Sequence, residues 1–358
     1  MKRYRKTERG GGLFCAIEHE QAVASKTTGI LKLRNVIPWE SFRPLLEDLT
    51  GYATRDWSKG GKPPFDPVLM FKVLVLQKFH GLSDDATEEQ IFERTSFKNF
   101  LGLRIGDGIP DAKTLWDFKQ RIEEGGREGS RKLFEAFGAH LEGKGLIARE
   151  GSIVDATFVE APRQRNDREQ NQRIKQGERP AEFDHNPAAG RQKDSEARWT
   201  KKNAQVHYGW KNHAKADLKT KLILKASTTA AHVHDSQVFE ELLDDKDQAV
   251  LADSAYHSEA HLLELNAQEF LMRKATRGHP LSEAQQKTNH TISRMRVRVE
   301  HIFARMAQMG ADLCRSIGLK RAAQHNHFSN LVYNMDRYAW PDSLNAAKAP
   351  PKDAKGHR

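Results

Sequence analysis

Three carboxylates occupy sequence positions where apolar side chains would be expected to pack in a core. They are Asp155 in the apolar run 152–159, Asp253 directly after the run 249–252, and Glu300 in the stretch 296–303. An unpaired carboxylate is costly to bury, so each of them needs a cationic partner or must stay protonated. Carboxylates that converge from different elements could instead share bound metal ions.

Oxygen ligands of this type suit Mg²⁺, with Mn²⁺ as an alternative. Two such ions about 4 Å apart activate an attacking oxygen and stabilise the leaving oxygen of a phosphodiester. This chemistry needs no thiol, which agrees with the scarcity of cysteine in the chain. Structural roles remain open: a polar strand end for Asp155, a turn or helix cap for Asp253, and an ion pair with Arg296 or Arg298 for Glu300.

The composition of the 358-residue chain predicts polyanionic partners. It carries 58 Lys and Arg against 48 Asp and Glu, which gives a formal net charge of +10. No apolar run approaches the ~20 residues that cross a bilayer. The N-terminus lacks the apolar stretch of a secretory signal, and the two cysteines, Cys15 and Cys314, cannot build a disulfide framework. We therefore expect a soluble, cytoplasmic protein.

Several side chains are candidates for contact with DNA, although each also has a plain reading as a surface charge or a core aromatic. Lys and Arg contacts to phosphates give salt-dependent affinity, and an aromatic ring can stack on a displaced base. The candidates are Lys201, Lys202, Lys211, Arg294 and Arg298 for phosphates, and Tyr256 for stacking. Asp235 is expected to cap the helix that begins beside it.

The elements that would position these residues change in type at residue 146. Residues 38–145 have helical periodicity, and the segment between Pro67 and Gly81 predicts a helix that is apolar on every face. This region therefore predicts an all-α domain, either of helix-turn-helix type or a plain helical bundle. Residues 146–340 predict a mixed α/β sheet covered by helices. Its expected strands are 152–159, 205–210, 222–226, 249–252 and 270–272, and its expected helices begin near 235, 258 and 283.

Three further segments are expected to lie outside the packed cores. Residues 1–37 predict a basic, flexible arm and lead-in, and residues 341–358 predict a disordered basic tail. Within the α/β region, residues 160–205 form a charged insertion in which Ile174 is the only aliphatic residue larger than alanine. Such a segment predicts a long loop.

The stretches around the three carboxylates resemble the acidic signatures of the DDE transposases of bacterial insertion sequences, in particular the group named after insertion sequence five. They read IVDAT at 153–157, VLADSAY at 250–256 and RVRVEHIF at 296–303. Further similar stretches are ARWTKKN at 197–203 with HYGWKNH at 207–213, VHDSQ at 233–237, and the helical block 67–103. The resemblance extends over roughly residues 38–340.

The resemblance implies a ribonuclease-H-like catalytic core that cleaves DNA and transfers strands with Mg²⁺. Asp155 would lie on the first strand, Asp253 after the fourth and Glu300 on the late helix, and Arg296 would orient Glu300 or contact a phosphate. The helical N-terminal domain would bind the terminal inverted repeats. The partners implied are double-stranded DNA, both terminal repeats and target, and a second copy of the chain in a homodimer or larger assembly on the bacterial nucleoid.

Two positions depart from the family pattern, which has Tyr three residues before Arg296 and Lys seven residues after Glu300. Here Ser293 and Ala307 stand at these positions. Two alternatives therefore stay open: a non-catalytic relative that represses its own element, and a host nuclease of ribonuclease-H type.

Overall fold

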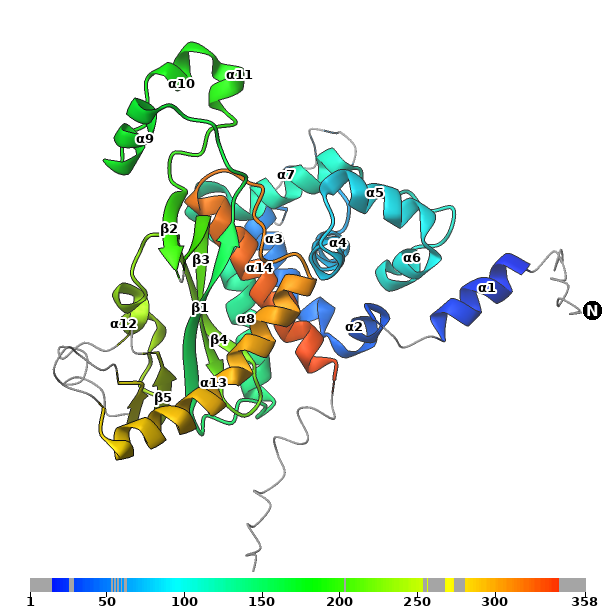
Figure 1. Ribbon diagram of the computed structural model, residues 1–358. Helices are drawn as coiled ribbons and strands as arrows, with labels where there is room; N and C mark the ends of the chain where they lie inside the picture. The colour runs from blue at the N-terminus through cyan, green and yellow to red at the C-terminus, as the bar shows by residue number, and fades with distance from the viewer. Residues whose placement is uncertain are drawn as a thin grey trace, which may run out of the picture. The chain divides into compact units, whose positions relative to one another are not determined.

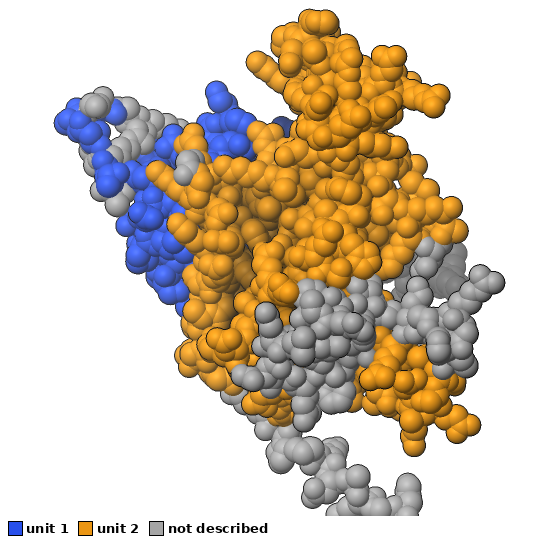
Figure 2. All heavy atoms as spheres, turned by 90° about the vertical axis from the view of Figure 1, so that its left-hand side faces the viewer, with its two compact units in different colours: residues 1–77, 82–121 blue, residues 78–81, 122–358 orange. Residues whose placement is uncertain are grey.

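The computed structural model describes residues 15–25, 29–52, 54, 56, 58, 60, 63–202, 204–253, 256, 268–273 and 281–340 (Figure 1). The chain forms two compact units, residues 1–77 with 82–121 and residues 78–81 with 122–358, which Figure 2 distinguishes by colour. The predicted arm at 1–12, the helix predicted at 258–267 and the tail at 341–358 lie outside the described residues. No helix in the described part of the chain is long and apolar enough to span a membrane.

All named secondary-structure elements in the described residues of the first unit are helices. Its elements are α1 (Cys15–Ala24), α2 (Leu31–Val36), η1 (Trp39–Phe42), α3 (Arg43–Thr50), α4 (Pro67–His80), α5 (Asp84–Glu93), α6 (Thr95–Leu101) and α7 (Ala112–Glu123), the last residues of α4 and α7 belonging to the second unit. An aromatic cluster forms its core, in which Trp39 makes edge contacts with Phe71 and Phe100 at centroid distances of 6.0 and 5.7 Å. The helices α1 and α2 lie in the segment that the sequence predicted to be a flexible lead-in.

Helix α4 has the limits that the sequence predicted. It begins at Pro67, and Gly81 follows its last residue with the positive φ of 62° that favours glycine. Apolar residues on all of its sides are buried, as expected for a helix inside a bundle. The next helix, α5, is capped by Ser83, whose hydroxyl accepts a hydrogen bond from the Ala86 N–H.

The second unit contains a six-stranded mixed sheet. Strands β1 (Ser152–Glu160), β3 (Gln205–Asp217) and β4 (Ile223–Ala230) are antiparallel, and β2 (Arg198–Lys202) pairs with the first residues of β3. Strands β5 (Ala249–Ala252) and β6 (Gln268–Leu271) continue the sheet parallel to β1. Asp253 therefore follows the fifth strand and not the fourth, because the short β2 is an additional strand.

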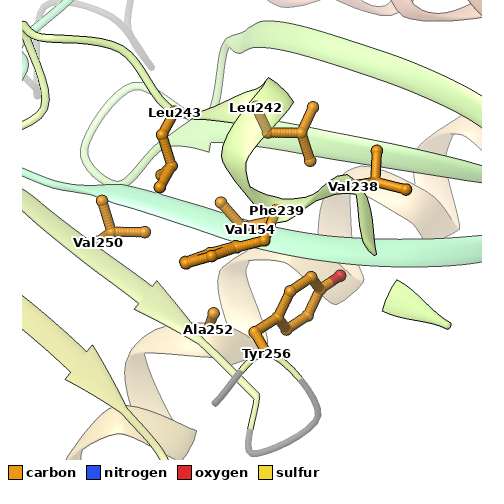
Figure 3. Close-up of a cluster of buried hydrophobic side chains, with 8 residues drawn as sticks. All are labelled: Val154, Val238, Phe239, Leu242, Leu243, Val250, Ala252 and Tyr256. Atoms are coloured by element: carbon orange, nitrogen blue, oxygen red, sulfur yellow. The ribbon is translucent and has the colours of Figure 1, made fainter. Parts of the chain in front are cut away.

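Helices cover both faces of this sheet (Figure 1). Helices α13 (Glu283–Gln308) and α14 (Leu319–Tyr338) cover one face. On this face, Asn212 forms a hydrogen bond with Asn330 of α14, and Asp155 accepts a hydrogen bond from Arg296 of α13. The opposite face packs Val154 against η4 (Asp235–Val238) and α12 (Phe239–Leu242) in the cluster of Figure 3. Helix α8 (Gly129–Gly143) packs on α14, so the compact unit begins near residue 122, whereas the sequence predicted a domain boundary at 145.

The prediction of a long loop at 160–205 is wrong, because this insertion contains α9 (Arg168–Lys175), α10 (Glu182–His185), α11 (Pro187–Gly190) and β2. Asp167 and Gln170 form a capping box that begins α9. The insertion buries Ile174 and Phe183, and the charged ends of Arg179 and Lys193 lie 5.6 and 5.5 Å from the Phe183 ring. Cation–aromatic contacts and the stems of long side chains thus supply the cover that aliphatic residues would otherwise provide.

Candidate active site

Asp155 lies on β1, on the sheet face that meets α13. Its side chain is 19% exposed, and its Oδ2 lies 2.6 Å from Arg296 Nη2. Its Oδ1 accepts a hydrogen bond from the Ala156 N–H at 2.9 Å. Burial raises the pKa of the Asp155 carboxyl above its ordinary value, while Arg296, the Ala156 N–H and Lys202 act in the opposite direction.

Asp253 lies beside Asp155 because β1, which carries Asp155, and β5, which directly precedes Asp253, are parallel neighbours. Ser152 pairs with Val250 and Ile153 with Leu251, and the same register continued for two residues brings Asp155 opposite Asp253. Parallel partners point to the same face of a sheet. Arg296 Nη1 lies 3.9 Å from Asp253 Oδ1, and the Asp253 side chain is 38% exposed.

Arg296 therefore holds both carboxylates with one guanidinium. It extends from α13 toward β1 and the end of β5, its side chain is only 16% exposed, and its Nη1 also approaches the Met272 sulfur at 3.5 Å. A planar guanidinium with several donors suits this geometry, since separate N–H groups can face separate carboxylates. The pairing with Arg296 partly offsets the cost of burying the Asp155 carboxylate.

Glu300 lies one turn after Arg296 on α13 and is exposed. Within the described residues it makes no hydrogen bond or ion pair, and no group of three or more His, Cys, Asp or Glu side chains there is close enough to hold a metal ion. Ser293 and Ala307 are also exposed and lie along the same side of the helix, at spacings of three and seven residues from Arg296 and Glu300. The structure thus brings Asp155 and Asp253 together with Arg296, but not with Glu300.

The donor set matches a hard divalent cation in chemical type. Asp155 and Asp253 present carboxylate oxygens to a single positive group, the Arg296 guanidinium. Oxygen donors of this kind are those that Mg²⁺ and Mn²⁺ prefer, and a thiol is absent from the group. The two carboxylates therefore fit such an ion in type, while a third ligand from Glu300 requires α13 or its side chain to move.

The residues predicted to contact DNA differ in their exposure. Lys201, Lys202 and Arg294 are exposed, as is Arg298, which donates a hydrogen bond to the Leu218 carbonyl at 2.6 Å. Lys211 is buried, and its ammonium group is 2.7 Å from both Asp235 Oδ1 and the Val233 carbonyl oxygen. Tyr256 is fully buried against Phe239 in the cluster of Figure 3.

A second polar cluster, on the opposite face of the sheet, was not predicted. Lys211, His213 and Lys215 alternate along β3, and Asp235 pairs with Lys211, while Lys215 lies 2.8 Å from both Asp244 and Asp247. The prediction that Asp235 caps a helix is wrong, because the side chain of His234 accepts the Ser236 N–H at the start of η4. The sequence does contain a signal for this cluster, because Lys211, His213 and Lys215 are spaced two residues apart and side chains at that spacing lie on the same face of a strand.

Two comparisons with protein families agree with this division of the chain. Residues 147–335, more than half of the chain, match the family described as Transposase DDE domain, and they contain the sheet, Asp155, Asp253, Arg296 and Glu300. Residues 18–121 match a second family, described as Transposase domain (DUF772), whose end coincides with that of the first compact unit. No solved structure matches the chain. The paired aspartates on adjacent parallel strands thus lie inside the matched catalytic region, and the chain belongs to the transposase DDE domain family.

Proposed function

We propose that this protein is a DNA transposase that binds the terminal inverted repeats of its insertion sequence, cleaves DNA and transfers strands. One observation carries the proposal. Asp155 and Asp253, which belong to the region that matches the transposase DDE domain, lie on neighbouring strands and share one cationic group. Two carboxylates that converge from separate elements supply oxygen ligands of the kind that metal-dependent phosphodiester chemistry uses.

The sheet topology supports a ribonuclease-H-like core. An antiparallel β1-β3-β4 arrangement is extended by the parallel strands β5 and β6, and α13 and α14 cover the face that carries Asp155. In open α/β sheets, ligand sites lie at the carboxyl ends of parallel strands, which is where Asp253 follows β5. The order of the acidic residues along this topology agrees with that of the family.

Asp155, Asp253 and Glu300 would hold Mg²⁺, or alternatively Mn²⁺. When bound, such ions lower the pKa of an attacking hydroxyl group and stabilise the leaving oxygen of the phosphodiester. Arg296 would fix the positions of Asp155 and Asp253 and supply positive charge beside a DNA phosphate. The exposed Glu300, on the same side of α13, would join them when the DNA substrate is present.

The DNA substrate would contact both compact units. Lys201, Lys202 and Arg294 are exposed and can contact backbone phosphates in the second unit. In the first unit, α7 exposes Lys113, Trp116 and Arg121, a basic and aromatic surface suited to the inverted repeats. Cleavage at both ends of an element would require two copies of the chain, so we propose that a homodimer or larger assembly forms on DNA.

Cleavage of inverted-repeat DNA by the full-length protein tests the proposal. The variants Asp155→Asn, Asp253→Asn and Glu300→Gln remove one charge each with little change in volume, and Asp245→Asn changes an exposed acidic residue as a matched control. We expect the first three variants to lose Mg²⁺-dependent nicking while they still bind the repeat DNA, and the control to cleave normally. Normal nicking by Asp155→Asn would show that the catalytic assignment is wrong.

A repressor is the second candidate, and the position of Arg296 favours it. The guanidinium already forms an ion pair with Asp155 and lies 3.9 Å from Asp253, and Ser293 and Ala307 stand where the family has Tyr and Lys. A repressor would bind the inverted repeats with the same affinity in the wild type and in Asp155→Asn, and neither protein would cut DNA with Mg²⁺ or Mn²⁺.

A further inference from the structure

A small cavity opens on the sheet directly beyond Asp155. It measures about 230 Å³ and is lined by Ala156, Thr157 and Phe158 of β1 and by Lys202, Gln205 and His207 of β2 and β3. Drug-sized ligands occupy pockets of roughly 300–1,000 Å³, so this cavity suits one planar group with a short polar attachment and excludes a base pair. Its first lining residue, Ala156, follows Asp155 on β1, and the side chains of Ala156 and Phe158 point to the sheet face opposite to that of Asp155.

An aromatic pair forms one side of this cavity. The rings of Phe158 and His207 are stacked with centroids 4.0 Å apart and an interplanar angle of 5°. Glu160 fixes the imidazole, because its Oε1 lies 2.7 Å from His207 Nδ1 and its Oε2 accepts the Tyr208 N–H at 3.3 Å. An ionised carboxylate only accepts hydrogen bonds, so Nδ1 carries the proton and Nε2 remains as the polar atom for a ligand.

Lys202 supplies the positive charge of the cavity. Its ammonium group lies 5.9 Å from the Phe158 ring centroid, and Lys202 is exposed. Lys211 lies at a similar distance of 5.6 Å from the same ring, but its charge is paired with Asp235.

We propose that this cavity binds one unpaired nucleotide of the DNA substrate, beyond Asp155 along β1 and on the opposite face of the sheet. The base would stack on the Phe158–His207 pair, and its phosphate would contact Lys202 and the Gln205 amide. An aromatic platform combined with a cation is the usual means of holding unpaired bases, and it tolerates different sequences. The inference rests on the proposed function and adds a substrate contact that Asp155, Asp253 and Glu300 do not provide.

The test compares two DNA ligands of the full-length protein in a buffer without divalent metal. One is a blunt inverted-repeat duplex, and the other is the same duplex with a single-stranded overhang that carries 2-aminopurine at its first unpaired position. We expect the overhang DNA to bind about tenfold more tightly, with quenched 2-aminopurine fluorescence, since stacking on an aromatic contributes about that factor per base. An abasic site at the same position should remove the preference.

Two variants assign this preference to the cavity, and a third serves as their control. Phe158→Leu should reduce the preference to near unity with unchanged affinity for the blunt duplex. Lys202→Ala should weaken binding of both DNA ligands, because Lys202 also contacts backbone phosphates, but it should weaken the overhang DNA more, so that the preference again falls to near unity. Lys202 is exposed, so its variant does not depend on core packing. Trp199→Leu is the matched control, because Trp199 is an exposed aromatic of β2 that packs on Tyr208 and does not line the cavity.

Equal binding of blunt and overhang DNA by the wild type, or an unchanged preference in both Phe158→Leu and Lys202→Ala, would overturn the inference. The readout is binding without metal, so it is independent of cleavage. Asp155→Asn should keep the overhang preference. A protein that shows the preference but never cleaves would therefore disprove the proposed catalysis and leave the nucleotide site standing.

Discussion

Arg296 Nη2 lies 2.6 Å from Asp155 Oδ2 and joins α13 to β1 across 141 positions of the sequence. Both side chains are largely buried, and the second guanidinium nitrogen, Nη1, reaches toward Asp253 at 3.9 Å. The relationship places a fixed positive charge where two carboxylates meet. A divalent cation that binds the same oxygens would compete with this charge.

Arg296→Ala should lower stability without metal and increase the response to metal. Removal of the guanidinium leaves Asp155 largely buried without its partner, which costs on the order of 2 kcal/mol. Without that competing charge, Mn²⁺ should raise the melting temperature of the DNA-free variant more than that of the wild type. Thermal unfolding with and without Mn²⁺ measures both effects. Arg294→Ala, an exposed position two residues away, serves as the control, and an identical Mn²⁺ response in both variants would contradict the prediction.

His213 should make the protein sensitive to mild acid. It is fully buried, its Nε2 is 2.8 Å from Thr229 Oγ1, and burial lowers the pKa of its imidazole to about 4, against the weaker opposite effect of Asp235. A histidine that is neutral when folded and takes up a proton when unfolded stabilises the fold above pH 6.5, and this stability is lost as the pH falls toward 4. The expected loss from His213 alone is about 2 kcal/mol between pH 7 and pH 5.

Urea unfolding of the wild type and His213→Gln at pH 7 and pH 5 measures this contribution. The variant should lose less stability on acidification than the wild type, by about the same 2 kcal/mol. His290→Gln replaces an exposed histidine and should behave as the wild type does. If His213→Gln and the wild type show the same pH dependence, His213 is not the group that titrates.

Gly209 should not tolerate a side chain. It lies on β3 opposite Glu160 with φ of 143°, and a Cβ atom there would stand 2.4 Å from the Val159 carbonyl oxygen and 2.7 Å from the Ala161 nitrogen. Both atoms belong to backbone, so Gly209→Ala must displace β1 from β3, at a cost of about 3 kcal/mol. Gly138→Ala on α8 meets nothing within 4 Å and should instead stabilise the helix by up to about 1 kcal/mol. A chemical denaturation series of the two variants tests the opposite signs.

The sequence was informative where a local pattern determines the outcome. Apolar runs identified β1 and β5. Asp155 lies two residues after Ile153 and Asp253 two residues after its partner Leu251, so the proximity of the two aspartates follows from the parallel pairing of the strands. The position of Glu300 was harder to predict. It depends on how α13 is rotated about its axis, which is set by the packing of Val299, Ile302 and Met306.

Burial of the predicted DNA contacts could not be deduced from the sequence either. Lys211 and Tyr256 have residue types suited to nucleic acid, yet Asp235 pairs with the first and Phe239 packs on the second. Asp235 belongs to η4 and Phe239 to α12. The position of these two short elements on the sheet is set by tertiary contacts, which a local hydrophobic pattern in the sequence does not predict.

Strand β1 is supported unequally along its length. All nine residues of β1 pair with β3 along one edge. Along the other edge, β5 pairs with β1 only at Ser152 and Ile153. In the described part of the chain, that second edge is paired again only at Glu160, which forms a bridge with Leu313. Asp155 lies between these two supports. Between these two supports, the edge of β1 that carries Asp155 has no paired strand among the described residues, so the carboxylate borders a part of the sheet edge whose backbone is open to an approaching DNA strand.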